Sequence, residues 1–337
     1  QEGGVPADYR WYNLTAHKTD ANIYAKLEQQ LGNHLYGYAD LQLRSVQYTI
    51  NGFRKNPEVH TDEQYLFFNP KFGMSYIQGA HKVFGSYAMA NKEPNRDDFE
   101  AGVSQIPKPE QLNDIELGYQ YNNGRSSLGV QLYYMLYKDQ LVATGKINDV
   151  GAYTRSNVDE SYRRGIELSG ASKVAPWLNV QANLTLSQNK IKSFTEYIDD
   201  YDNGGQQEVQ HSNTDIALSP GAIAATTLSF CPFDMGRDQD LFVDLIGKYV
   251  SRQYLDNTSN KDRSINPYAL ANVRLSYSIR NRWIREAGVS LSVNNVLNRK
   301  YESKGYTFSY LYGGLQTSNY YFPQAGRNYL LTLTLGF

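Results

Sequence analysis

The residues that most often carry metal or acid–base chemistry are few in this sequence and widely scattered. Five histidines occur among 337 residues, and they do not show the spacing of metal ligands. The chain also lacks the zinc-protease helix motif, the phosphate-binding glycine loop, the nucleophile elbow and the dinucleotide-binding glycine pattern. We therefore expect a protein that is not an enzyme, with no cofactor and no metal site.

Two histidines and one acidic stretch are the remaining candidates for binding chemistry. His60 and His211 fall in polar connections, where they could contact haem or a metal-bearing ligand or could simply be solvated. Asp199, Asp200 and Asp202, followed by two glycines, resemble the start of a calcium loop. The EF-hand pattern fails, because no glutamate stands at the twelfth position from Asp199 or Asp200.

The strongest candidate for ligand binding is the aromatic-rich connection at residues 301–322. Aromatic side chains give a large contact area at a small cost in conformational entropy, and they suit flat or amphipathic ligands such as haem, cobalamin, siderophores or sugars. Some of these rings could instead pack within the connection. The candidate contacts are Tyr306, Phe308, Tyr310, Tyr312, Tyr320 and Tyr321.

Composition narrows both the partners and the fold. The net charge is −1 and basic residues do not cluster with aromatic ones, so we expect no nucleic-acid partner. Cys231 is the single cysteine, which excludes an internal disulfide. Mean hydropathy is −0.58, and no run approaches the ~20 apolar residues that a membrane-spanning helix requires. A helical membrane protein is therefore excluded.

Side chains of opposite polarity alternate along most of the chain. Near the C-terminus Leu331, Leu333 and Leu335 share one parity, and Thr332 and Thr334 share the other. Because successive side chains of a strand point to opposite faces, each such segment has one apolar and one polar face. The polar parity is rich in Asn, Gln, Ser and Thr, as in a crowded hydrated lumen, whereas a soluble sandwich would show more Lys and Glu. The pattern predicts an all-β, transmembrane, antiparallel up-and-down β-barrel.

The alternating runs define about thirteen strands, joined by short and long connections in turn. This alternation is typical of a barrel with turns at one end and loops at the other. Since single-chain bacterial barrels have an even number of strands, residues 1–337 are predicted to be the C-terminal portion of a larger barrel. The predicted strands are 15–31, 34–50, 64–78, 82–90, 112–122, 126–142, 158–171, 177–192, 220–231, 239–255, 265–280, 285–301 and 325–337.

Charged residues within the predicted strands should line the lumen. Glu116 and Glu167 each stand between apolar neighbours, so both carboxylates should point inward and join an ion-pair network, with ligand contact as the alternative. The candidate cationic partners are Arg44, Lys71 and Arg274. Glu93 and Arg96 follow the end of a strand, where we expect them to anchor a loop rather than to bind a substrate.

Eight short segments, each weak alone, occur in a specific order along the chain. They are 38–44 (YADLQLR), 68–73 (FNPKFG), 93–97 (EPNRD), 115–119 (IELGY), 164–168 (RGIEL), 253–258 (QYLDNT), 293–301 (VNNVLNRKY) and the terminal Leu-Gly-Phe. Together they resemble the TonB-dependent outer-membrane receptors, particularly those of Bacteroidetes, over essentially the whole chain.

The resemblance implies a barrel of about 22 strands with a plugged lumen, in which 1–337 would supply the last strands while the plug and early strands lie outside this sequence. It also implies uptake of a scarce nutrient, such as a siderophore, haem or cobalamin, with TonB-derived energy. The implied location is the outer membrane of a Gram-negative bacterium, with a periplasmic C-terminus. The implied partners are the N-terminal part of the same receptor, the inner-membrane TonB complex acting through the plug, outer-membrane lipid and the small-molecule nutrient.

Phe337 resembles the C-terminal signal that the barrel-assembly machinery reads. Two other functions remain open at this point. One is a passive porin-like channel closed from this chain alone, and the other is a soluble β-rich binding or adhesion module.

Overall fold

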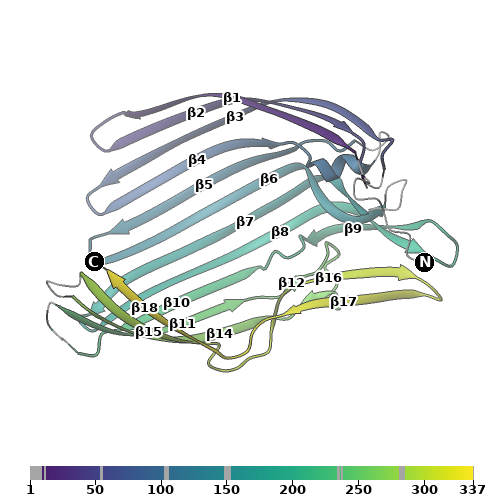
Figure 1. Cartoon of the computed structure of the whole chain (residues 1–337). Helices are drawn as coiled ribbons and strands as arrows, with labels where there is room; N and C mark the ends of the chain where they lie inside the picture. The colour runs from purple at the N-terminus through teal and green to yellow at the C-terminus, as the bar shows by residue number, and fades with distance from the viewer. Residues whose placement is uncertain are drawn as a thin grey trace.

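One large antiparallel sheet dominates the computed structural model, which describes residues 10, 13–53, 56–101, 106–147, 153–233, 236, 238–280 and 285–336. Within these residues, thirteen strands run side by side in the order β1 to β8, β10, β11, β14, β15 and β18 (Figure 1). No helix of the described residues is long and apolar enough to cross a membrane.

The elements are β1 (Thr15–Gln30), β2 (Leu35–Asn51), β3 (His60–Gln78), β4 (His81–Lys92), η1 (Arg96–Ala101), β5 (Glu110–Asn122), β6 (Ser126–Ile147), β7 (Tyr153–Ala175), β8 (Leu178–Asp200), β9 (Gln206–Asp215), β10 (Ala222–Phe230), β11 (Gln239–Val250), β12 (Gln253–Tyr254), β13 (Ser264–Ile265), β14 (Tyr268–Ile279), β15 (Glu286–Asn294), β16 (Glu302–Leu311), β17 (Leu315–Pro323) and β18 (Asn328–Gly336).

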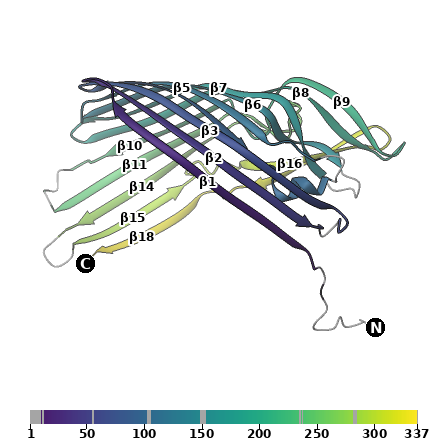
Figure 2. The same ribbon diagram turned by 90° about the horizontal axis from the view of Figure 1, so that it is seen from above.

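The sheet curves into a trough, with β1 and β18 at its two edges (Figure 2). Short turns gather at one end of the strands, here the turn end, and long connections gather at the other, the loop end (Figure 1). The predicted class, an all-β antiparallel wall of a transmembrane barrel, is confirmed, and the described strands form an arc of that barrel.

All thirteen predicted strands are present, but several of the predicted long connections contain strands as well. The connection after β8 continues into β9, and the aromatic connection contains β16 and β17. These strands lie at the loop end (Figure 1). Because they do not alternate in the way that a lipid-facing strand does, the sequence pattern did not identify them.

The convex face of the wall changes from apolar to polar at a definite level. Leu43 of β2 lies in register with Ile23 of β1 and Phe68 of β3, and all three belong to the exposed apolar side chains. Four residues further along β2, Gln47 lies in register with Gln64. A spanning strand keeps its outer side chains apolar only within hydrocarbon, so the lipid boundary at the loop end lies between these two rows.

At the same level the concave face changes from polar to apolar. Beyond Arg44 the inward side chains of β2 become apolar: Val46 is fully buried and Ile50 is 1% exposed. They form a core with Phe53 and Phe99, which the connections at the loop end bring across the concave face. The strands therefore continue past the bilayer into a water-exposed extension with its own core.

A second buried cluster lies at the loop end of β6, β7 and β8. Its members are Val142, Val158, Ile191, Phe194 and Ile216. The strands β7 and β8 are 23 residues long, more than the ~10 residues that cross the hydrocarbon. The extra length carries this cluster, which buries the loop-end part of the wall.

The lipid boundary predicts unequal effects of one substitution at two positions of β2. Leu41→Arg places a charge within the apolar band and should lower the free energy of unfolding by about 2 kcal/mol, whereas Gln47→Arg should change it by less than about 0.5 kcal/mol. Urea unfolding of protein inserted in phospholipid vesicles measures both. Equal losses would contradict the boundary.

Candidate ligand-binding surface at the loop end

The predicted aromatic connection folds as a β-hairpin. The strands β16 and β17 pair along their length, and Gly313 and Gly314 close the turn with φ values of 58° and 110°, which favour glycine. Parallel pairing of Tyr310 with Asp199 joins this hairpin to the far end of β8. The hairpin is therefore a structured part of the loop end rather than a free loop.

One face of the β16–β17 hairpin carries most of the predicted aromatic contacts. Tyr306 lies directly opposite Tyr320, and their rings stack with centroids 4.8 Å apart. Phe322 lies beside Tyr306, at 6.3 Å between centroids, and Phe308 and Tyr310 continue the same face. Tyr306 and Tyr320 are 51% and 49% exposed. We call this surface the aromatic face; it consists of Tyr306, Phe308, Tyr310, Tyr320 and Phe322.

The opposite face of the hairpin is attached to the start of β13 and to the connection between β12 and β13. The Tyr321 hydroxyl donates to the Ser264 carbonyl at 3.2 Å, and the Asn319 amide donates to the Asp262 carbonyl at 2.7 Å. Tyr312 lies at the turn and is exposed. Strand alternation thus separates Tyr321, which anchors the hairpin, from the other predicted aromatic contacts.

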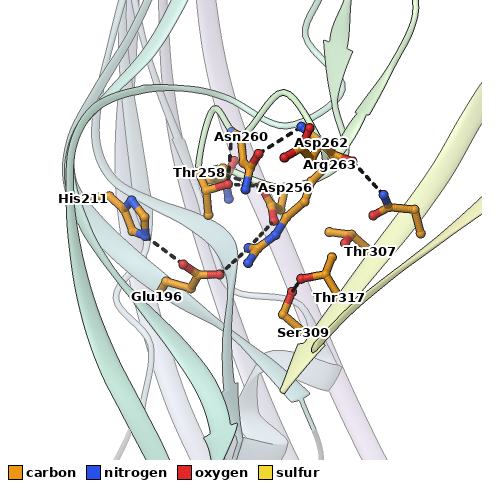
Figure 3. Close-up of polar contacts among 12 residues, drawn as sticks. Glu196, His211, Asp256, Thr258, Asn260, Asp262, Arg263, Thr307, Ser309 and Thr317 are labelled. Carbon is orange, nitrogen blue, oxygen red and sulfur yellow. Dashed lines mark hydrogen bonds and ion pairs between the residues drawn. The ribbon is translucent and has the colours of Figure 1, made fainter. Parts of the chain in front are cut away.

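A charged cluster ties this connection to the β8–β9 hairpin (Figure 3). Arg263 is 4% exposed, and its Nη1 donates to Glu196 Oε1 at 2.6 Å and to Asp256 Oδ2 at 3.0 Å. The other oxygen of Glu196 lies 2.7 Å from His211 Nε2, and the His211 ring stacks on Phe194. The predicted ligand contact His211 is therefore engaged by a carboxylate of its own chain.

Hydrogen bonding outweighs burial at Arg263. Burial alone would lower the pKa of the guanidinium, but hydrogen bonds to Glu196 and Asp256 raise it above its ordinary value. Arg263 is thus a fixed cation at this place, held between Glu196 of β8 and Asp256 of its own connection.

The stretch 253–258 shapes the connection that carries Arg263. Asn257 accepts a bond from the Ala217 amide and donates to the Ala143 carbonyl, both at 2.8 Å. Asp256 accepts bonds from the amide and the hydroxyl of Thr258 at 3.0 and 2.6 Å. These polar side chains bind the main chain of their own protein, which gives this segment a structural role.

The acidic stretch at the end of β8 links the β8–β9 turn to the β16–β17 turn. The Asp200 carboxylate accepts bonds from the amides of Asp202 and Asn203 at 3.0 and 2.9 Å, and the Asn203 side chain and amide lower the pKa of Asp200. The Asp202 carboxylate accepts the Gly313 amide at 3.0 and 2.8 Å. No group of metal-ligating side chains gathers in the described part of the chain.

Arg44 pairs with partners that the sequence did not indicate. Its guanidinium donates to both oxygens of Asp20 at 3.0 and 2.6 Å and to both oxygens of Glu93 at 2.8 and 2.9 Å. Glu93 also accepts a bond from Lys18 at 2.9 Å. Glu93 therefore anchors the connection after β4 to the wall, in agreement with the expected anchoring role.

The other two predicted lumen cations, Arg274 and Lys71, do not pair with Glu116 or Glu167 either. Arg274 lies directly opposite Asp244, and the two form an ion pair at 2.7 Å. Lys71 lies opposite Asp40 on β2, and among the described residues no ion pair reaches it. Cross-strand register decides these neighbours, and a single sequence does not reveal the register.

The two predicted lumen acids face the concave side without a cationic partner in the described residues. Glu116 accepts a long hydrogen bond of 3.5 Å from Ser86, its register neighbour on β4. Glu167 lines a pocket of about 330 Å³ with Gln131 and Thr185. The structure thus does not bring Glu116 and Glu167 together with Arg44, Lys71 or Arg274.

The remaining predicted positions lie elsewhere. His60 begins β3, is exposed, and is separated from His211, which lies on β9. Arg96 begins η1 and its guanidinium lies 5.1 Å from the centre of the Phe53 ring, which fits the expected anchoring of the loop. Phe337 lies outside the described residues.

Sequence reasoning missed the acids that hold the loop end together. Asp98 accepts two bonds from Arg155, at 2.7 and 2.5 Å. Glu196 shares its parity with Phe194 and Ile198, both buried. An acid within an apolar row is a readable signal, since a buried charge requires a partner.

Comparison with known families gives one match. The family model described as TonB dependent receptor-like, beta-barrel matches residues 2–296. None of the curated proteins matches the chain.

Solved structures with the same fold include three receptors. The ferric-catecholate import receptor Fiu of E. coli K12 is 19% identical, with a TM-score of 0.67 over 96% of this chain and 45% of that chain. The siderophore receptor PiuA of Acinetobacter baumannii is 14% identical, with a TM-score of 0.71 over 94% and 43%. The ferric yersiniabactin uptake receptor FyuA of Yersinia pestis is 18% identical, with a TM-score of 0.66 over 96% and 47%. The chain spans less than half the length of these structures.

The ion pair between Arg263 and Glu196 predicts a local loss of stability when Glu196 is substituted. Glu196→Gln leaves Arg263 with one carboxylate instead of two, and it should lower the free energy of local opening of residues 253–265 by about 3 kcal/mol. Hydrogen exchange measured by mass spectrometry reports this opening. The control is Glu160→Gln, which breaks an exposed pair with Lys192 and should leave the exchange unchanged. Exchange at wild-type rates in Glu196→Gln would show that the pair does not hold the connection.

Acidification should weaken the anchor at Glu93, which lies beyond the end of β4. Burial pushes the pKa of Glu93 upward, but hydrogen bonds from Arg44 and Lys18 outweigh it and hold the pKa below its ordinary value. The stability from this carboxylate is therefore present above about pH 4 and is lost as the pH falls through the lowered pKa. Urea unfolding in detergent between about pH 6 and about pH 3 should show this loss, and Glu93→Gln should flatten the dependence. An identical slope in both proteins would rule out the anchor.

Proposed function

Because the chain belongs to the TonB-dependent receptor β-barrel family, we propose that it forms the C-terminal part of the barrel wall of an import receptor in the outer membrane of a Gram-negative bacterium. The receptor binds a scarce nutrient at its loop end and imports it with energy from the TonB complex. The match of the family model to residues 2–296 is the observation that carries this proposal.

The one-sided structure of the wall supports the proposed direction of import. The longest connections between the wall strands lie at the loop end, where connections fold onto the concave face and bury Phe53 and Phe99. The opposite end has short turns, and β18 runs toward it, since Gly336 lies in register with Glu286 next to the β14–β15 turn. In the proposed orientation the loop end faces the outside of the cell and the C-terminus lies in the periplasm.

The two edges of the arc support the proposed division of the receptor. Among the described strands β1 pairs with β2 alone, and β18 pairs with β15 alone. Unpaired backbone groups do not persist in hydrocarbon, so both edges require further strands. We infer that the N-terminal part of the same receptor supplies those strands together with a plug, through which the TonB complex acts.

The aromatic face is the proposed contact for the nutrient. Tyr306 and Tyr320 form a stacked, half-exposed pair on a hairpin that the Arg263 cluster holds in place. Rings of this kind bind flat aromatic ligands by offset stacking. Receptors with this fold are described as ferric-catecholate, siderophore and ferric yersiniabactin receptors, and we propose a ferric siderophore as the substrate class.

Uptake of radioactive iron tests the function. Cells that make the receptor as their one route for a ferric catecholate siderophore should accumulate iron when TonB is intact and should lose uptake when TonB is deleted. Uptake that persists without TonB would instead identify a passive channel. The absence of uptake in both strains would contradict an import role for this siderophore class.

Substitution of the stacked tyrosines tests the contact. Tyr306→Ala and Tyr320→Ala should each weaken binding of the ferric siderophore about fivefold to tenfold, because each removes one ring of the stack. Tyr249→Ala removes a ring that is 40% exposed on the convex face of the wall and should leave the affinity unchanged. Equal affinities for all three variants would remove the aromatic face from the proposal.

A further inference from the structure

A shallow groove of about 560 Å³ opens on the convex face where β6, β7 and β8 approach the lipid boundary. Its floor contains Leu132, Ile166 and Leu186, which lie side by side in one register row. Leu132 and Leu186 are 47% and 45% exposed. The groove is therefore an apolar depression in the surface that faces lipid.

An interruption in strand pairing produces the groove. The strand β10 pairs with β8 as far as Leu186, and β9 pairs with β8 from Lys190 onward. Between them the Ser187 amide donates to the Gly221 carbonyl at 2.8 Å, the Ser187 hydroxyl donates to the Pro220 carbonyl at 3.1 Å, and the Ile216 amide donates to the Asn189 carbonyl at 3.0 Å. Gly221 lines the groove and has no side chain to fill it.

A single cation stands directly above the apolar floor. Arg164 lies in the next register row, where its Nε and Nη2 donate to Gln188 Oε1 at 3.0 and 2.7 Å. Its guanidinium also lies 5.3 Å from the centre of the Tyr162 ring. Gln188 is neutral, and no carboxylate within the described residues pairs with Arg164. The guanidinium is thus held in position while its charge remains uncompensated.

The neighbouring cations differ from Arg164 because each of them pairs with a carboxylate. Lys190 pairs with Asp215 at 2.8 Å, and Lys192 pairs with Glu160. Both lysines lie on β8, and they are closer to the loop end than Gln188, the residue of β8 in register with Arg164. The uncompensated charge is therefore located at the edge of the groove, at the level where the convex face changes from apolar to polar.

We propose that this groove binds a phosphate-bearing lipid of the leaflet at the loop end. An acyl chain lies on the row of Leu132, Ile166 and Leu186, and the phosphate accepts hydrogen bonds from Arg164. Guanidinium groups recognise phosphate with paired, charge-assisted hydrogen bonds, and basic positions at the membrane surface bind anionic head groups. The site rests on the membrane-spanning fold and is independent of which nutrient the receptor imports.

Native mass spectrometry tests the site. Protein purified from outer membranes into a mild detergent is mixed with phosphatidylglycerol or with phosphatidylcholine of the same chain length. The wild-type protein should retain one phosphatidylglycerol in preference to phosphatidylcholine, and Arg164→Gln should reduce that preference about tenfold. Arg125→Gln is the matched control, because it removes an exposed cation at the turn end of β6 and should preserve the preference.

A second variant separates the acyl groove from the charge. Leu186→Trp fills the floor and should reduce retention of both lipids, while heat-modifiable migration on gels shows that each variant is folded. Excess inorganic phosphate should leave the retained lipid in place. The proposal is overturned if the wild-type protein shows no preference, if Arg164→Gln keeps it, if Leu186→Trp retains both lipids at wild-type levels, or if phosphate alone displaces the lipid.

Discussion

The wall of this protein depends on one constraint: within hydrocarbon, every backbone amide and carbonyl must find its partner inside the protein. An antiparallel sheet meets this requirement strand by strand, which is why the wall strands from β1 to β18 pair with their neighbours in nearly unbroken succession. The same constraint fixes the two faces, because one set of side chains must then meet lipid. Where the strands leave the bilayer, the faces exchange character, so that Leu43 points to lipid whereas Val46 is buried on the concave side.

Beyond the bilayer, ion pairs between distant segments hold the structure together. Arg44 with Glu93, Arg155 with Asp98, and Arg263 with Glu196 each join a strand to a connection or to another element. Buried and partly buried pairs of this kind contribute little net stability compared with apolar packing, but removing one partner leaves a costly unpaired charge. They therefore specify how the connections fold over the concave face. A connection that is fixed in this way presents the aromatic face already ordered, which lowers the entropy lost when a ligand binds.

The sequence predicted the wall strands well and the loop end poorly, for the same physical reason. Contact with lipid imposes alternation on strands such as β2 and β8, so the chain itself reports their position. The strands β9, β16 and β17 lie outside the hydrocarbon, and there Thr307 or Asn319 can alternate with tyrosines without a lipid-facing row. Partners at the loop end were missed for a related reason, since Asn257 bonds to Ala143, which lies 114 positions away.

By itself, the sequence determined that the chain forms a two-faced membrane wall and which receptor family it resembles, because the period of two is a local property of extended backbone. Only the tertiary structure decided that Tyr306 belongs to an exposed face while Tyr321 anchors the hairpin. It also decided that Arg44 pairs with Asp20 and Glu93. Likewise, only the structure showed that Arg164 keeps an uncompensated charge above an apolar groove. These outcomes depend on cross-strand register and on contacts between segments far apart in the chain, which no local pattern encodes.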